Sequence, residues 1–141
     1  MKMETVQQAI TGQEVYTDIG APYAALVDFY AAFNGGDLQA MRENWLQAEQ
    51  ASMSNPLGGV KRGWREIEAV YDKIFNGPAD VYVEYYDYSI HVTDKMFCAV
   101  GRERGKFILH GQTIELAIRT SRIYTHDGQG WKQIHHHGSI H

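Results

Sequence analysis

The hydrophobic positions in the first half of the chain recur at the spacing of helices. Between residues 18 and 33, apolar side chains fall three or four positions apart, which predicts a helix with Pro22 in its first turn. A short helix is expected after Asp37, a residue suited to the N-cap position, and another apolar stripe predicts a helix over 64–75. Residues 46–54, between these last two helices, are interpreted as a strand.

The second half of the chain changes to long segments of β-forming residues separated by turn sequences. Strands joined by short turns pair with each other, so these segments predict an antiparallel sheet. Three helices followed by such a sheet give an α+β domain whose helices cover one face of the sheet. Apolar and aromatic residues occupy both faces of the first strand, so the second face is expected to be buried in a homodimer. The predicted strands are 80–92, 95–109, 113–126 and 130–139.

Length and charge narrow the classes of protein that this chain can represent. Its 141 residues suit one domain, which we assign to 18–139, preceded by a partly ordered N-terminal extension over 1–17. The formal net charge of -4 gives no electrostatic reason to bind nucleic acid. The start of the chain lacks the apolar core of a signal peptide, and no apolar run is long enough to span a membrane, so a cytoplasmic location is expected.

Imidazole side chains gather on the last predicted strand. Because strand side chains alternate, His135 and His137 are expected on one face, and His136 on the other, in packing or a dimer contact. Two imidazoles at this spacing suit a metal, but a third ligand is missing, so no metal and no other cofactor are expected. His135 and His137 are interpreted as pocket-wall or interface residues and as candidates for acid–base catalysis. The complete face is predicted to be Trp131, Gln133, His135, His137 and Ser139.

Arg122 has the parity of the apolar side of its predicted strand, which is apolar at alternate positions from 114 to 118. Its guanidinium is therefore expected to point into the core or a cavity, where it needs an anion. That anion is either the carboxylate of a bound ligand or a carboxylate of the chain, such as Glu103 or Glu115. The sequence leaves both alternatives open.

Four stretches of the chain together carry a family resemblance: residues 30–41, the Asn-Pro-Leu-Gly rim at 55–58, the helix start at 63–67 and the ending at 127–139. They resemble the nuclear transport factor 2-like superfamily, and more closely its SnoaL-like and ketosteroid-isomerase-like branch. The ending is also similar to that of the association domain of calcium/calmodulin-dependent protein kinase II, with its Trp followed by His-x-His-x-Ser. The resemblance implies three helices on a strongly curved antiparallel sheet that forms a cone with a pocket, and subunits that pair through the sheet.

The resemblance also implies where the chemistry of this branch would lie. In ketosteroid isomerases the matching rim begins with an aspartate that acts as the general base, whereas this chain has Asn55. The position of their oxyanion-donating tyrosine falls on Phe29, one residue before Tyr30. Both departures argue against isomerisation by that mechanism. The similarity to the association domain implies that Arg122 faces the pocket.

We therefore expect a homodimer in which each pocket binds a small molecule that carries a carboxylate or a carbonyl group. One alternative is an isomerase, cyclase or hydratase with a pocket histidine as acid or base. The other is a non-catalytic self-association domain that forms an assembly larger than a dimer. The predicted ligand-binding residues are Arg122, Asn55, Tyr30, His135, His137 and Tyr124.

Overall fold

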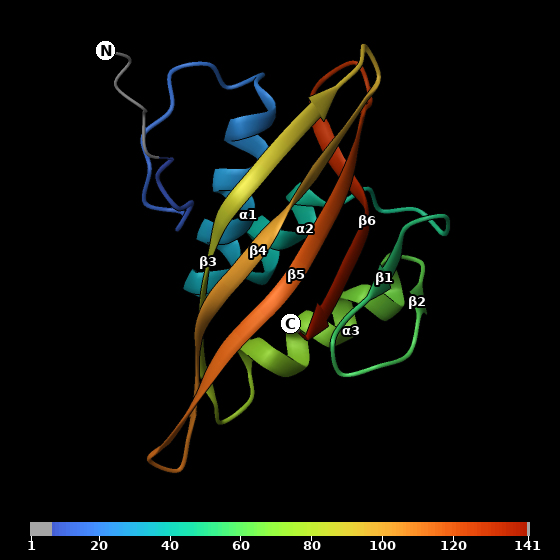
Figure 1. Ribbon diagram of the computed structural model, residues 1–141. Helices are drawn as coiled ribbons and strands as arrows, with labels where there is room; N and C mark the ends of the chain where they lie inside the picture. The colour runs from blue at the N-terminus through green and yellow to red at the C-terminus, as the bar shows by residue number, and fades with distance from the viewer. Residues whose placement is uncertain (1–6, 141) are drawn as a thin grey trace, which may run out of the picture.

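A computed structural model describes residues 7–140 of the chain. Within these residues, three helices lie on one face of a six-stranded sheet (Figure 1), which confirms the predicted α+β class. Residues 1–6, part of the predicted extension, lie outside the described range. The elements in chain order are α1 (Pro22–Gly35), α2 (Leu38–Asn44), β1 (Ser52–Ser54), β2 (Lys61–Arg62), α3 (Trp64–Phe75), β3 (Asp80–Val92), β4 (Met96–Leu109), β5 (Gln112–His126) and β6 (Trp131–Ile140).

The strand order of the sheet is β2-β1-β6-β5-β4-β3. Strands β3 to β6 form the predicted antiparallel meander, whereas β1 pairs with β6 in parallel. The predicted strand over 46–54 is wrong for most of its length, because the chain turns between Leu46 and Ala51 through bonds from the Ala48 and Ala51 amides. The three residues of β1 remain a paired strand, and the Leu46 amide also donates to the Gln133 carbonyl of β6 at 2.9 Å.

Local sequence explains where the elements begin and end. Pro22 occupies the start of α1, and the preceding residues form a turn, so the helix begins later than residue 18. Gly36 ends α1 in the left-handed conformation with φ 62°. The Asp37 carboxylate caps α2 by accepting from the Ala40 amide at 3.0 Å. At the tip of the β4–β5 hairpin, two successive residues with positive φ, His110 and Gly111, form the tight turn.

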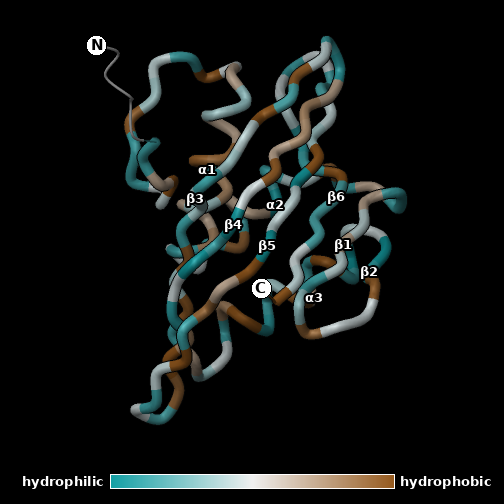
Figure 2. Tube along the Cα trace, in the orientation of Figure 1, coloured by the Kyte–Doolittle hydropathy of each residue, from teal (hydrophilic) through white to brown (hydrophobic). Residues whose placement is uncertain are grey.

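The core lies between the inner face of the sheet, which we define as the face toward the helices, and helices α1, α2 and α3. Figure 2 shows hydrophobic and hydrophilic positions interspersed along the long strands, as expected where one face is buried and the other is not. Across residues 7–140, none of the helices has the length and apolar character needed to cross a membrane. The largest fully buried side chains include Trp45, Tyr30, Tyr85, Tyr124, Phe29 and Phe97.

Candidate functional site

Strand β6 contains a bulge that changes which of its side chains face the helices. Gln133 and His135 pair with consecutive residues of β5, so Ile134 is the extra residue. Alternation restarts after the bulge, which places His136 on the inner face, where it is buried. The predicted face that joins Gln133 to His135 and His137 is therefore wrong. His135 and His137 lie on the outer face of the sheet instead.

Arg122 lies on the inner face, the side that its parity predicts, and only 2% of its surface is exposed. Its Nη2 donates to Glu103 Oε2 at 2.9 Å, and its Nη1 donates to Gln133 Oε1 at 2.9 Å. The guanidinium carbon lies 3.6 Å from the ring centroid of Phe29, which gives a cation–π contact. The chain itself thus supplies a carboxylate, that of Glu103, to balance the charge of Arg122.

Tyr30 joins this ion pair from helix α1. Its hydroxyl donates to Glu103 Oε2 at 2.6 Å and accepts from Arg122 Nε at 3.5 Å. Burial and the nearby Glu103 raise the pKa of Tyr30 well above its ordinary value, so its phenol stays protonated. Burial acts to lower the pKa of Arg122, but Tyr30 and Glu103 outweigh burial and raise that pKa, so the arginine stays charged.

A second group of polar side chains supports Gln133 from the side of helix α2. The Tyr124 hydroxyl donates to Asn44 Oδ1 at 2.8 Å, and Gln133 Nε2 donates to the same oxygen at 3.3 Å. Asn44 in turn donates from Nδ2 to the Ala25 carbonyl at 3.0 Å. Neither Gln133 nor Asn44 is among the predicted ligand-binding residues. No sequence pattern around Asn44 indicates a buried polar role, because that role depends on the packing of α2 against the sheet.

Three buried side-chain polar atoms have no hydrogen-bond partner among the described residues: two lie beside Arg122, and the third is Nε1 of Trp45. Thr120 Oγ1 and His136 Nδ1 make no hydrogen bond within the described residues, and they lie on neighbouring rows of the inner face. Buried polar groups are nearly always paired, so this corner of the interior has hydrogen-bonding capacity that the chain does not use. Burial, and then the charge of Arg122, lower the pKa of His136 well below its ordinary value, which makes it a neutral imidazole at neutral pH.

The other predicted site residues lie apart from this network. His135 Nδ1 lies 2.8 Å from Ser52 Oγ, and burial together with His137 lowers the pKa of His135. His137 is exposed. Asn55 lies in the loop after β1, where its Oδ1 accepts from the Leu57 amide at 3.1 Å. The predicted residues that meet in the interior are Arg122, Tyr30 and Tyr124.

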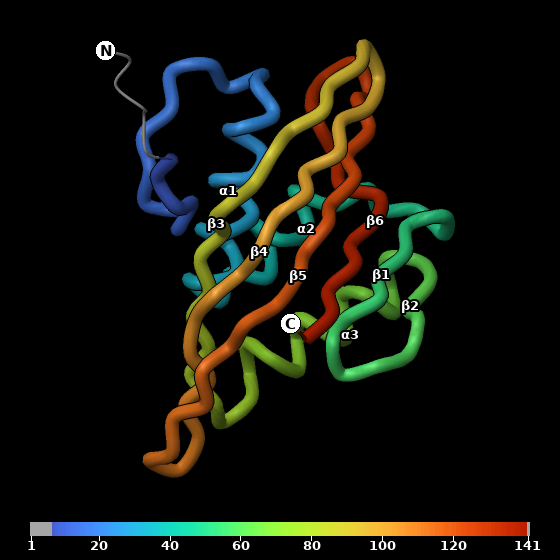
Figure 3. Tube along the Cα trace, viewed as in Figure 1, coloured from blue at the N-terminus to red at the C-terminus, as the bar shows by residue number. Residues whose placement is uncertain are grey.

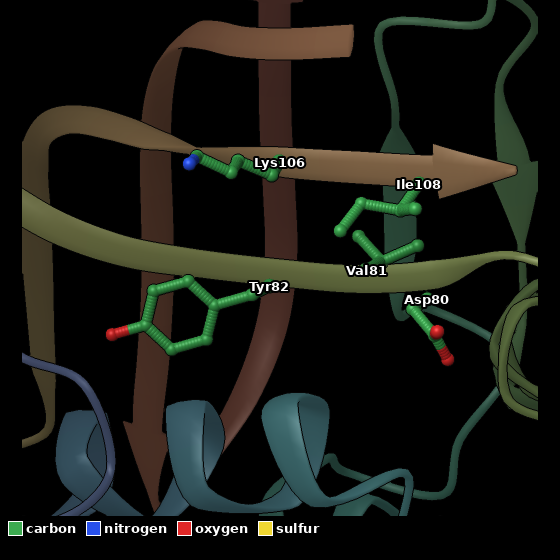
Figure 4. Close-up of a pocket in the computed structure, with 5 residues that line it drawn as sticks. All are labelled: Asp80, Val81, Tyr82, Lys106 and Ile108. Carbon is green, nitrogen blue, oxygen red and sulfur yellow. The ribbon is translucent and has the colours of Figure 1, made fainter. Parts of the chain in front are cut away.

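The surface of the described residues includes two pockets that Arg122 does not line. The first has a volume of about 420 Å³ and lies between the start of β3 and the end of β4, where Figure 4 shows the residues that line it: Asp80, Val81, Tyr82, Lys106 and Ile108. The second, of about 600 Å³, lies against the start of α3. In the part of the chain that the structure describes, no three His, Cys, Asp or Glu side chains are placed to hold a metal ion.

The outer face of the sheet, opposite the helices, has a row of apolar side chains. Met96, Cys98 and Val100 alternate along β4 with buried inner-face residues, and Ile123 of β5 is paired with Cys98. Val100 is 45% exposed and Met96 is 44% exposed. We call these four residues the outer strip. None of them is needed to fill the core that the helices cover.

The SnoaL-like domain family matches residues 23–141, which is most of the chain. The chain belongs to this family. Among curated proteins, none matches the chain. Residues 7–22 thus precede the matched part of this SnoaL-like protein, although Ile10 is buried in its core.

Solved structures of nuclear transport factor 2-like proteins share the fold of this SnoaL-like chain, as the resemblance implies. A superfamily member from Salmonella enterica is 19% identical, with a TM-score of 0.75 over 83% of this chain and 86% of that one. A candidate calcium/calmodulin-dependent protein kinase type II association domain from Thiobacillus denitrificans is 23% identical, with a TM-score of 0.69 over 85% and 94%. The hub of this kinase from S. rosetta is 15% identical, with a TM-score of 0.73 over 84% and 93%. At these identities the likeness shows the fold alone.

Proposed function

We propose that this protein is a self-associating SnoaL-like domain that forms at least a homodimer through the outer face of its sheet. The observation that carries the proposal is the outer strip: Met96, Cys98, Val100 and Ile123 form an apolar surface that none of the helices within residues 7–140 covers. Contiguous exposed apolar surface is characteristic of protein interfaces. The similarity to an association domain and to a kinase hub supports the same function.

The chemistry of the interior adds support for this proposal. A binding site for a carboxylate needs a cation whose charge is free, but the charge of Arg122 is already paired with Glu103 and its Nη1 with Gln133. The outer face, in contrast, has side chains whose contacts within the chain are incomplete. A second copy placed there would bury the outer strip and leave the interior network as it is.

The test is the molar mass in solution, measured by size-exclusion chromatography with light scattering over a range of concentrations. Val100→Lys should weaken self-association by about tenfold or more, because a charge would be buried at the interface. Val60→Lys is the matched control, since Val60 is 49% exposed in the loop before β2. A monomer at high concentration, or equal effects of the two substitutions, would contradict the proposal. A mass above that of a dimer would specify a larger assembly.

A second candidate function, binding of a small molecule, is favoured by the unpartnered atoms Thr120 Oγ1 and His136 Nδ1. The Thr120 hydroxyl can donate to a carbonyl oxygen, and neutral His136 offers a ring nitrogen beside it. Because the charge of Arg122 is balanced, the ligand is expected to be neutral and to carry a carbonyl rather than a carboxylate. Arg122, Tyr30 and Tyr124 would form the polar wall behind it, and Asn55, in the loop after β1, would border it.

Two probes distinguish the ligand types, with cyclohexanone as the neutral carbonyl compound and benzoate as the carboxylate. Cyclohexanone should shift the NMR signals of the His136 ring, and Thr120→Val, which keeps the side-chain shape, should remove that response. Absence of any shift with cyclohexanone would remove this function. An acid–base reaction here would use His136, since His135 and His137 lie on the outer face.

A further inference from the structure

Strand β3 forms one edge of the sheet, and the segment before helix α1 lies along it (Figure 3). Ile10 makes a two-way backbone pair with Tyr85: the Ile10 amide donates to the Tyr85 carbonyl at 2.8 Å, and the Tyr85 amide donates back at 2.9 Å. This is the pattern that an added antiparallel strand would make. An unpaired edge would otherwise present these groups to another chain.

Two side-chain amides repeat this two-way pairing on either side of Tyr85. Gln7 donates from Nε2 to the Tyr88 carbonyl at 2.9 Å and accepts from the Tyr88 amide at 3.0 Å. Asn34 of α1 donates from Nδ2 to the Val83 carbonyl at 2.8 Å and accepts from the Val83 amide at 3.0 Å. At Val83, Tyr85 and Tyr88, the backbone amide and carbonyl that point away from β4 are therefore hydrogen-bonded within the chain.

The segment is held in place by close packing as well as by hydrogen bonds. The Ile10 side chain is completely buried. Gly12 has φ 97°, and a Cβ at this position would overlap the backbone of Ala31 in α1. Only glycine therefore allows the segment to lie this close to the helix.

Charge on β3 does not protect the edge to the same degree. Glu84 and Asp87 would repel the same residues of a second β3, but Arg104 pairs with Glu84 at 2.6 Å, and Arg102 pairs with Asp87 at 3.2 Å. Their negative charges are thus largely compensated within each copy. Protection of the edge then depends on the segment that covers it.

We propose that residues 7–12 are a detachable edge seal, and that the edge of β3 beneath them is a second association surface, used by β3 of another copy when the seal opens. This surface is separate from the outer strip. Opening requires the loss of the Ile10 and Gln7 pairs, while the sheet itself stays intact.

Gly12→Val in the full chain tests the proposal, with Gly35→Ala as the control, because a Cβ at Gly35 meets nothing within 4 Å. In Gly12→Val, the Tyr85 and Tyr88 amides should exchange hydrogen about tenfold faster or more, the equivalent of about 1.4 kcal/mol. Amides of β5 should remain protected. Light scattering should show a larger mass than for the unchanged chain, and the double variant Gly12→Val with Val100→Lys should still associate more strongly than Val100→Lys alone.

Unchanged protection of the Tyr85 amide, or faster exchange without new association, would overturn the proposal. A double variant that associates no more strongly than Val100→Lys alone would also overturn it, because the new association would then use the outer strip. If Gly12→Val unfolds the whole domain, Gln7→Ala remains informative, since it removes only the two bonds to Tyr88. That variant should speed exchange at Tyr88 and leave Tyr85 protected, and equal exchange at both would contradict the arrangement.

Discussion

Removal of either partner of the Arg122–Glu103 pair should destabilise the fold strongly. Both side chains are buried, with 2% and 5% of their surfaces exposed, and the two atoms that join them are 2.9 Å apart. Arg122→Met would leave the Glu103 carboxylate with only the hydroxyl of Tyr30. Glu103→Leu would leave the Arg122 guanidinium with Gln133 and the ring of Phe29. In each case a charge stays in a region that excludes water.

The burial of the pair indicates how much each substitution should reduce the free energy of unfolding. Breaking a buried ion pair by removing one partner costs about 3–5 kcal/mol, because the remaining charge is uncompensated. The double variant Arg122→Met with Glu103→Leu leaves no charge behind, so it should cost less than the sum of the two single changes. A coupling energy of about 2 kcal/mol or more is expected.

Urea unfolding followed by circular dichroism gives the four free energies of this cycle. Arg104 and Glu84 provide the control, since they lie 2.6 Å apart but have 54% and 23% of their side chains exposed. Removal of either control partner should cost at most about 1 kcal/mol. If the single changes at Arg122 and Glu103 cost no more than those at the control pair, the reasoning from burial is refuted.

Three further predictions follow from buried or capping residues. The pKa of His136 is lowered in the folded state, so the unfolding free energy should fall as pH drops below about 6.5, by up to about 1.4 kcal/mol per pH unit. In urea titrations at several pH values, His136→Asn should reduce this dependence on pH. Asp37→Ala removes the cap of α2 and should cost about 1 kcal/mol by the same assay, whereas an unchanged midpoint would contradict the cap. Phe97→Ala should cost about 3–5 kcal/mol, since the ring is fully buried and stacks on Tyr124, and a cost under about 1 kcal/mol would contradict that packing.

The helices and long strands were predictable because their signals are local. The apolar stripe over 64–75 matches α3 residue for residue, and the turn at His110 and Gly111 separates β4 from β5 as expected. The inward direction of Arg122 followed from strand parity alone. Each of these features depends on periodicity within one segment or on the conformation of two adjacent residues.

Features that depend on pairing between distant segments were not predictable in the same way. The bulge at Ile134 shifts the faces of β6, and no residue at that position signals an extra residue. Both Glu103 and Glu115 were expected as possible partners for Arg122. Glu115 has the opposite parity within β5 and is exposed, and the pairing of β4 with β5 brings Glu103 to Arg122. The pairing of Ile10 with Tyr85 joins residues 75 positions apart in the sequence.

The intramolecular partner of Arg122 limits what the interior can bind. A carboxylate ligand that displaced Glu103 from the Arg122 guanidinium would leave the Glu103 carboxylate buried without its cation, at a cost of about 3–5 kcal/mol. A cost of about 4 kcal/mol would weaken a ligand of intrinsic Kd 1 μM to about 1 mM. Recognition of anions by this arginine is therefore unfavourable for as long as Glu103 stays ionised and in place. A neutral ligand beside Thr120 and His136 leaves the Arg122–Glu103 pair in place and does not incur this cost. The same is true of a second copy bound to the outer strip, so the ion pair disfavours anionic ligands specifically.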